Sequence, residues 1–429
     1  MSVADSLELG TRELEAYCLS MAQRAKGGAA RLAGLFPKVK NDWLLRCAAE
    51  LRNESDAILR ANALDCEAAP GYGLTTAAID RLRLSIDRIE DMARGLEQIA
   101  ALPDPIGETM EGSVRPNGLE VRKVRVPLGT VFFIYESRPN VTVDAAAICL
   151  KSGNAVVLRG GKEALHSSQA LVRIMVECAA QCGIPTDALQ FVETTDRAAV
   201  GHFLALPEYI DVAIPRGGRG LIERVVAEAQ MPVIKHFDGN CHVYVDRTAD
   251  LDMALQILIN SKCQRMGVCN ACESLLVHAD VAEAFLTIAG AELKKRDIRM
   301  HADPEACRWL PQAVAASEED WSAEYLGPEI SIKVVGGLQS AIDHINRYGS
   351  RHTDAIVTRD LDAARSFQQQ VDSSAVVVNA STRLNDGGEI GLGAEIGIST
   401  DKLHARGPCG LKELTTYKYL LTGNGQLRS

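Results

Sequence analysis

Val131-Phe132-Phe133-Ile134 is a short apolar run, and Ala155-Val156-Val157-Leu158 repeats its character after a stretch with a helical pattern. Such runs, rich in Val and Ile, predict strands that are buried on both faces. Similar runs follow at 189–192, 212–214, 243–245, 275–277, 330–332, 355–357 and 375–378. Helical segments separate nearly all of them. The sequence therefore predicts an α/β fold with two parallel sheets built from right-handed crossovers.

The region before these strands has two further patterns. From residue 5 to about residue 100, apolar residues recur three and four positions apart, which predicts helices. Near residues 113–122, Asn117-Gly118 lies between alternating runs and predicts a β-hairpin. The alternation changes phase between Val121 and Val124, which predicts a β-bulge.

Composition narrows the class of protein. The chain has 429 residues, enough for more than one domain, and its 47% hydrophobic and 24% charged residues are typical of a folded protein. A net charge of −10 argues against nucleic-acid binding, and no apolar stretch approaches the ~20 residues of a membrane span. The acidic start has no signal-peptide pattern, and the twelve scattered cysteines are typical of reduced thiols. We expect a cytoplasmic enzyme.

Two glycine-containing turns follow predicted strands, where parallel sheets bind ligands. They are Arg159-Gly160-Gly161-Lys162 and Arg216-Gly217-Gly218-Arg219. Neither matches a dinucleotide fingerprint or a P-loop, and each alone is a tight turn at least as often as a phosphate site. Because Arg159 and Lys162 are cations, the first turn suits the 2′-phosphate of NADP. We predict an NADPH/NADP site at these turns.

A candidate nucleophile lies in Gly267-Val268-Cys269-Asn270, a turn just before the predicted strand 275–277. A turn exposes the sulfur of Cys269, and a thiolate there could attack a carbonyl carbon. Arg265 would favour the thiolate if this stretch is helical, since it lies four residues earlier. The alternative is a small buried thiol.

Further motifs follow one another at 126–129, 135–142, 151–154, 159–161, 238–242, 267–271, 379–383 and 404–408. In this order they resemble the aldehyde dehydrogenase superfamily, and within it the γ-glutamyl phosphate reductases, from about residue 10 to the end. The resemblance implies an aldehyde dehydrogenase-like fold with two parallel-sheet α/β domains and a β-hairpin oligomerisation arm. We expect an NADP-binding domain at 1–107 and 128–245, a catalytic domain at 246–390, and an arm and tail at 108–127 and 391–429.

The resemblance also implies roles for single residues. Cys269 becomes the nucleophile, Asn140 the side-chain donor of an oxyanion hole, and Glu324 the carboxylate that holds the nicotinamide ribose. Without the resemblance, Asn140 would be a turn residue and Glu324 a solvated carboxylate. Candidates for binding the anionic substrate are Arg138, Arg265, Ser381, Thr382 and Arg383.

The implied reaction is reduction of L-glutamyl 5-phosphate by NADPH through a cysteine thioester, the second step of proline synthesis from glutamate. Hydrolytic members of the superfamily have a glutamate where our alignment places His236, and its absence fits a reductase that needs no activated water. A packed or hydrogen-bonded histidine is the alternative for His236. The substrate could be channelled from glutamate 5-kinase, and the arm implies a homo-oligomer, because exposed alternating strands are a liability on a monomer.

Two alternatives remain. The enzyme could act on another semialdehyde. It could also be a thiol redox or zinc module, because Cys263, Cys269, Cys272 and His278 lie close in sequence and Cys269 and Cys272 form a CxxC pair. The first spacing is wrong for a zinc knuckle and no second knuckle exists, so we expect no metal. Cys272 is interpreted as a packing residue that could form a disulfide with Cys269 on oxidation.

Overall fold

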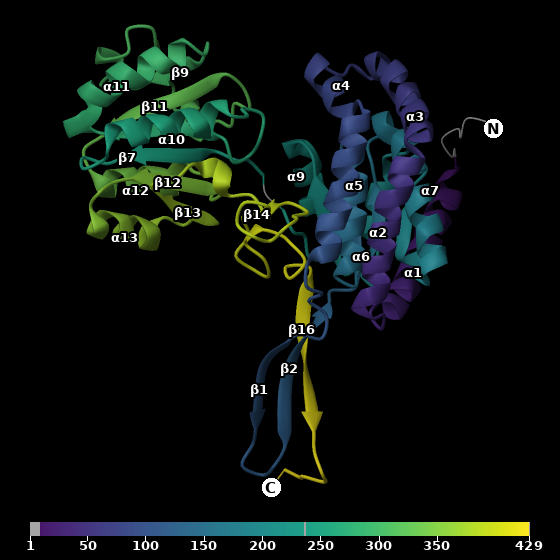
Figure 1. The fold of residues 1–429 in the computed structure, drawn as a ribbon. Coiled ribbons are helices and arrows are strands. Elements are labelled where there is room, and N and C mark those ends of the chain that lie inside the picture. Colours follow the sequence, from purple (N-terminus) through teal and green to yellow (C-terminus); the bar gives the residue numbers. More distant parts are fainter. Residues whose placement is uncertain (1–8, 236, 429) are drawn as a thin grey trace. The chain divides into compact units, whose positions relative to one another are not determined.

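The computed structural model describes residues 9–235 and 237–428, and its contacts divide the chain into two compact units. Unit 1 comprises Met1–Lys235, Leu392–Gly397 and Cys409–Ser429, and unit 2 comprises His236–Gly391 and Ile398–Pro408. Each unit has its own sheet and helices (Figure 1). No described helix combines the length and the apolar character needed to cross a membrane.

Unit 1 begins with the predicted helical region. Its helices are α1 (Thr11–Leu32), α2 (Pro37–Asn53), α3 (Ser55–Ala68), α4 (Thr76–Leu82) and α5 (Ile86–Ala101), with a 3₁₀ turn, η1 (Ala69–Tyr72), after α3. In α5 the side chain of Ser85 accepts the N–H of Arg88 at 3.2 Å and caps the helix. The apolar residues of α5 are buried on one face, and the helix ends just before Pro103.

The sheet of unit 1 has four parallel strands in the order β5-β4-β3-β6. They are β3 (Thr130–Tyr135), β4 (Ala155–Arg159), β5 (Leu189–Phe191) and β6 (Val212–Arg216). The connecting helices are α6 (Pro139–Lys151), α7 (Leu165–Cys182), α8 (Ala198–Leu204) and α9 (Arg219–Glu228), with short 3₁₀ turns η2 (Lys162–Ala164) and η3 (Thr186–Ala188). The strand order reverses direction between β3 and β6, which is where open parallel sheets bind ligands.

A second, three-stranded sheet of unit 1 forms the arm, in the order β1-β2-β16. Its strands β1 (Thr109–Val114), β2 (Glu120–Pro127) and β16 (Thr415–Thr422) are antiparallel. The predicted hairpin is confirmed: Gly118, at φ +82°, donates to the carbonyl of Arg115 at 2.8 Å. The predicted bulge is present opposite Val124, but the register shift falls in β1, between Thr109 and Glu111.

Unit 2 holds a seven-stranded, wholly parallel sheet in the order β10-β9-β11-β8-β7-β12-β13. The strands are β7 (Cys241–Val245), β8 (Cys272–His278), β9 (Arg299–Ala302), β10 (Val314–Ala315), β11 (Glu329–Val335), β12 (Thr353–Val357) and β13 (Ala375–Val378). The helices are α10 (Leu251–Cys263), α11 (Ala279–Lys294), α12 (Leu338–Tyr348) and α13 (Leu361–Gln370). Smaller elements are the 3₁₀ turns η4 (Ala306–Arg308), η5 (Glu319–Ser322) and η6 (Thr382–Leu384) and the pair β14 (Ile398–Ser399) and β15 (Gly407–Pro408).

The predicted α/β fold with two parallel sheets is confirmed, and every predicted strand is present. The predicted domain bounds differ from the units of the structure in two places. The predicted first domain includes residues 241–245, but β7 pairs with β8 and β12 in the sheet of unit 2. The predicted arm and tail include residues 398–408, which belong to unit 2. An apolar run does not reveal which of two sheets it joins, because that choice depends on long-range pairing.

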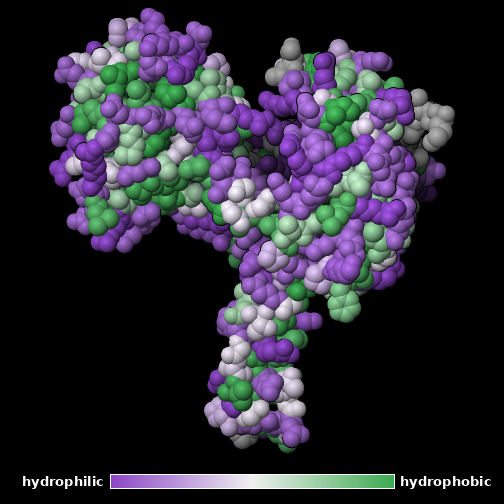
Figure 2. Space-filling model, in the orientation of Figure 1, coloured by the Kyte–Doolittle hydropathy of each residue, from purple (hydrophilic) through white to green (hydrophobic). Residues whose placement is uncertain are grey.

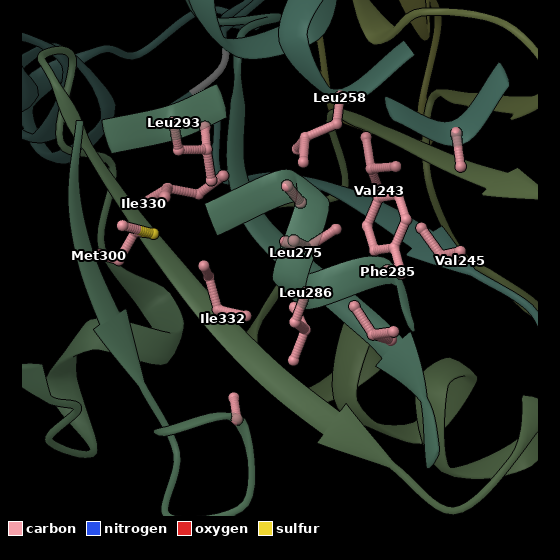
Figure 3. Packing of buried hydrophobic residues seen from close by; sticks show 14 of the residues in the cluster. Val243, Val245, Leu258, Leu275, Phe285, Leu286, Leu293, Met300, Ile330 and Ile332 are labelled. Atoms are coloured by element: carbon pink, nitrogen blue, oxygen red, sulfur yellow. The ribbon is translucent and has the colours of Figure 1, made fainter. Parts of the chain in front are cut away.

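Successive side chains of the central strands point to opposite faces of the sheet in unit 2, and they form one hydrophobic core on each face. Val243, Val245 and Leu275 pack against α10 and α11 on one face (Figure 3). Tyr244 and Leu276 point to the other face, towards α12 and α13. Full burial of each large apolar side chain contributes about 1.5–3 kcal/mol, so both helical layers are held firmly to the sheet.

Candidate active site

In unit 1, the predicted oxyanion-hole residue lies at the start of a helix. Helix α6 begins directly after the loop that follows β3, with Pro139 as its first residue and Asn140 as its second. Asn140 is exposed, and its side-chain amide donates to Asp144, one turn further on, at 3.4 Å. Burial raises the pKa of Asp144 to about 6, and the hydrogen bond from Asn140 opposes this effect. The exposed amide is therefore available to a ligand, and Arg138 is exposed at the N-cap position of the same helix.

The turn after β6 lies beside the turn after β3. The backbone N–H of Gly218, at the N-terminus of α9, donates to the carboxylate of Glu136 at 3.1 Å. A Cβ added to Gly217 would lie 2.6 Å from the carboxyl carbon of Glu136, so a larger residue would force this pair apart. The carboxylate of Glu136 therefore occupies the N-terminus of α9, at the point where the strand order reverses.

Arg159 and Lys162, predicted as a pair of phosphate ligands, have different surroundings. Arg159 is only 8% exposed, and its guanidinium donates to the carbonyls of Gly160 and Thr195, the latter at 3.2 Å. Its buried Nε has no hydrogen-bond partner among the described residues. Lys162 is exposed, with its ammonium 4.6 Å from the ring centre of Tyr72. Lys162 is the cation that can reach a ligand without rearrangement.

The turn that carries Cys269 connects α10 to β8 in unit 2. Helix α10 ends at Cys263, so the helical relation expected between Arg265 and Cys269 is absent. Cys269 is half-exposed, and its carbonyl accepts a hydrogen bond from the buried thiol of Cys241 at 3.1 Å. A Cβ added to Gly239 would lie 2.0 Å from the same carbonyl oxygen. Gly239 thus lets one backbone segment pack directly on the nucleophile.

The same glycine connects Cys269 to Glu324. The half-buried carboxylate of Glu324 accepts the backbone N–H of Gly239. Burial raises the pKa of Glu324 to about 7, the hydrogen bond opposes the rise, and the nearby charge of Asp238 adds to it. Glu324 is therefore a carboxylate that titrates near neutrality, one backbone segment away from Cys269.

The predicted residues 381–383 also contact the nucleophile turn. The hydroxyl of Thr382 donates to the carbonyl of Asn270 at 2.7 Å, and the guanidinium of Arg383 donates to the Asn270 side chain and, at 2.9 Å, to Gln264. Ser381 is hydrogen-bonded to Ser261 at 2.9 Å. Ser381 and Thr382 are buried, whereas Arg383 is half-exposed beside the turn. Of the three, Arg383 is the residue that a ligand could reach.

The sequence of the chain matches a family of known proteins. The model of the aldehyde dehydrogenase family matches residues 11–319. The chain belongs to the aldehyde dehydrogenase family. It is 60% identical over 420 residues to a γ-glutamyl phosphate reductase of Rhodopirellula baltica, covering 98% of this chain and 97% of that protein. It is 54% identical over 406 residues to one of Moorella thermoacetica, covering 95% and 97%.

Solved structures of this family also match the chain. A γ-glutamyl phosphate reductase of Thermotoga maritima matches with a TM-score of 0.94 and 42% identity, covering 96% of this chain and 100% of that one. A probable aldehyde dehydrogenase of Listeria monocytogenes matches at a TM-score of 0.71 and 18% identity, covering 96% and 98%, which shows the shared fold alone. The chain is accordingly an oxidoreductase of the aldehyde dehydrogenase family.

In this aldehyde dehydrogenase, the four residues of the zinc alternative have separate roles. Cys272 is fully buried in the core of unit 2, and His278 caps α11 by accepting the N–H of Asp280 at 3.1 Å. Cys263 lines a cavity of about 540 Å³ between α10 and α11 that Cys269 does not line. Within residues 9–235 and 237–428, no three His, Cys, Asp or Glu side chains are grouped as metal ligands.

Other neighbours of Cys269 were not expected from the sequence. Gly239 and Cys241 lie in the motif 238–242, which gave no hint that they contact the nucleophile turn. The fully buried ion pair Lys262–Glu273 was also not predicted from the sequence, because a linear pattern does not show that a helix end and a strand start are folded against each other. His236 lies outside the described residues.

Proposed function

We propose that this enzyme reduces L-glutamyl 5-phosphate to L-glutamate 5-semialdehyde, with NADPH as reductant and phosphate as the second product. The observation that carries the proposal is the near full-length identity of 54–60% to proteins named γ-glutamyl phosphate reductase. The half-exposed Cys269 in its turn supports the same chemistry.

The reaction would begin at Cys269. Its thiolate attacks the γ-acyl carbon, the bond to the phosphate oxygen breaks, and phosphate leaves with the bonding electrons. A thioester on Cys269 results, and splitting the reduction in this way replaces one difficult step with two easier ones. NADPH, when bound, supplies the hydride that reduces this thioester. The sulfur–carbon bond then breaks and the semialdehyde is released.

Negative charge develops on the carbonyl oxygen in both halves of the reaction. We assign its stabilisation to the side-chain amide of Asn140 and the backbone N–H of Cys269. Preorganised donors of this kind typically contribute about 2.7–4 kcal/mol each to lowering the barrier. The exposed position of Asn140 in the first turn of α6 supports this role.

The residues fit a nicotinamide dinucleotide in two respects. Gly217 and Gly218 lie at the N-terminus of α9, which favours phosphate once the Glu136 carboxylate that accepts the Gly218 N–H is displaced. Gly160 and Gly161 form the turn after β4, where Lys162 is exposed. Lys162 would pair with the 2′-phosphate of NADPH, because it is the exposed cation of this turn, whereas the buried Arg159 would support the shape of the turn through its bonds to backbone carbonyls. Glu324 would hold the nicotinamide ribose.

The substrate is anionic, so cations should bind it. Arg383 is our first candidate, because it is half-exposed and hydrogen-bonded to the turn of Cys269. Arg138 and Arg265 are exposed and could contribute. Ser381 and Thr382 would act through the shape of the turn that they support.

The product of the proposed reaction indicates the pathway that the enzyme serves. Glutamate 5-semialdehyde cyclises to pyrroline-5-carboxylate, the precursor of proline, so the enzyme would serve proline synthesis downstream of glutamate 5-kinase.

The arm exposes Val114, Tyr419 and Leu421 (69%, 58% and 63%) among hydrophilic side chains (Figure 2). Tyr419 and Leu421 share one face of the arm, and Val114 lies on the other. We propose that both faces contact other copies of the chain in a homo-oligomer.

Substrate choice tests the proposal against the semialdehyde alternative. In the reverse direction, with NADP⁺ and phosphate, kcat/KM for glutamate 5-semialdehyde should exceed that for succinate semialdehyde by at least about 10²-fold, because succinate semialdehyde lacks the α-amino group that the site would bind. Aspartate 4-semialdehyde keeps the amino-acid end and is one methylene shorter, so its kcat/KM should be lower by about 10–200-fold. A preference for either of the other two semialdehydes would contradict the proposed function.

A further inference from the structure

Beneath the nucleophile turn lies a buried ion pair that the proposed reaction does not use. The ammonium of Lys262 and the carboxylate of Glu273 are 2.6 Å apart, and both side chains are 0% exposed. Removing two charges from water is costly, and replacing such a pair with apolar residues is often neutral or stabilising. Stability alone therefore gives no clear reason for this pair.

The positions of the two residues indicate another reason. Lys262 is the penultimate residue of α10, and Glu273 is the second residue of β8. The turn that carries Cys269 lies between them, so this single ion pair connects the two ends of the turn. The pair thereby fixes the span that the turn must bridge.

Glu273 makes a second contact, with the loop that carries Glu324. Its other carboxylate oxygen accepts the backbone N–H of Leu326 at 3.3 Å. Leu326 has φ +51°, a left-handed conformation that a leucine adopts only when its surroundings hold it there. The ring of Tyr325 also lies 6.0 Å from the Lys262 ammonium. Helix, strand and loop thus meet at one carboxylate.

We propose that Lys262 and Glu273 are positioning residues, which hold the Cys269 turn and the Glu324 loop in a fixed relation within unit 2. The inference rests on the proposed function for the roles of Cys269 and Glu324. Lys262 and Glu273 themselves touch neither substrate nor cofactor in this account. The ion pair fixes the position of the Cys269 turn, and the hydrogen bond from the Leu326 N–H to Glu273 fixes the position of the loop that carries Glu324.

Two double variants separate these contributions. Lys262→Met/Glu273→Gln removes both charges but keeps an amide oxygen that can accept the Leu326 N–H. Lys262→Met/Glu273→Leu removes that acceptor as well. In both variants, alkylation of Cys269 by iodoacetamide should change at least about threefold, because the turn has lost its ion pair. NADPH binding, followed by fluorescence, should weaken about tenfold in the Leu variant and less than about threefold in the Gln variant.

Wild-type alkylation rates in the folded Gln variant, or equal NADPH affinities in the two double variants, would overturn the proposal. If the Leu variant does not fold, Glu273→Asp replaces it, since this change keeps both charges and draws the carboxylate back by one methylene. Glu273→Asp should weaken NADPH binding in a protein that remains folded at the assay temperature, and unchanged binding would again contradict the inference. Neither assay uses the acyl phosphate, so a wrong substrate assignment leaves these results intact.

Discussion

Among single residues, Cys269 is the one on which the proposed reaction depends first. Replacement by serine should lower turnover by at least about 10⁴-fold, because the hydroxyl is a far weaker nucleophile than a thiolate at neutral pH. The matched controls are Cys263→Ser and Cys272→Ser, which should keep most activity, since neither thiol belongs to the nucleophile turn. Steady-state kinetics of the three variants measure this. An active Cys269→Ser enzyme would show that another group attacks the substrate.

Lys162 should determine the preference for NADPH over NADH. Lys162→Ala should raise KM for NADPH roughly tenfold or more while KM for NADH changes little, because a lost hydrogen bond to a charged group costs about 1.5–3 kcal/mol. Arg159→Met is the informative companion: Arg159 is buried and bonded to backbone carbonyls, so its loss should also lower the melting temperature. Equal losses with both cofactors in Lys162→Ala would place the lysine away from the 2′-phosphate.

Glu324 should make cofactor binding depend on pH. Its pKa is raised to about 7 by burial, so the carboxylate is ionised above that pH and protonated below it. The ionised form accepts hydrogen bonds from ribose hydroxyls, so KM for NADPH should rise about tenfold as pH falls from 8 to 6. Glu324→Gln should flatten this dependence while other titrations remain. An unchanged pH profile in Glu324→Gln would remove Glu324 from the cofactor site.

At the scale of elements, local pattern and long-range pairing differ in how well they can be predicted. The strands 131–134 and 155–158 were predictable because a buried strand is marked by its own residues. The placement of β7 in the second sheet was not, since it depends on pairing with other strands. The tail was grouped with the hairpin only through the family resemblance, and no strand was predicted at β16.

The same distinction applies to the candidate site. The turn of Cys269 and the glycine turns were found from local sequence and from motif order. The burial of Arg159, the end of α10 before Arg265, and the Lys262–Glu273 pair appear only when the chain is folded. Side-chain burial and ion pairing depend on which segments meet, and a residue type alone does not specify them.

Assembly of the subunits should depend on the arm. Val114→Lys combined with Leu421→Lys places charges on its exposed apolar positions and should shift the oligomer towards the monomer at micromolar concentration. Light scattering after gel filtration measures the mass. Leu45→Lys, at a position 50% exposed on α2, is the control and should leave the mass unchanged. Persistence of the wild-type mass in the arm variant would place the subunit interface elsewhere.

At the scale of the whole molecule, the central claim is that the enzyme exchanges its thioester with phosphate and not with water. The most direct measurement is NADP⁺ reduction with glutamate 5-semialdehyde, in the presence of phosphate and after its rigorous removal. Turnover should require phosphate, and arsenate should restore it. Robust NADP⁺ reduction without either anion would mean that water resolves the thioester, and the enzyme would then be a hydrolytic aldehyde dehydrogenase.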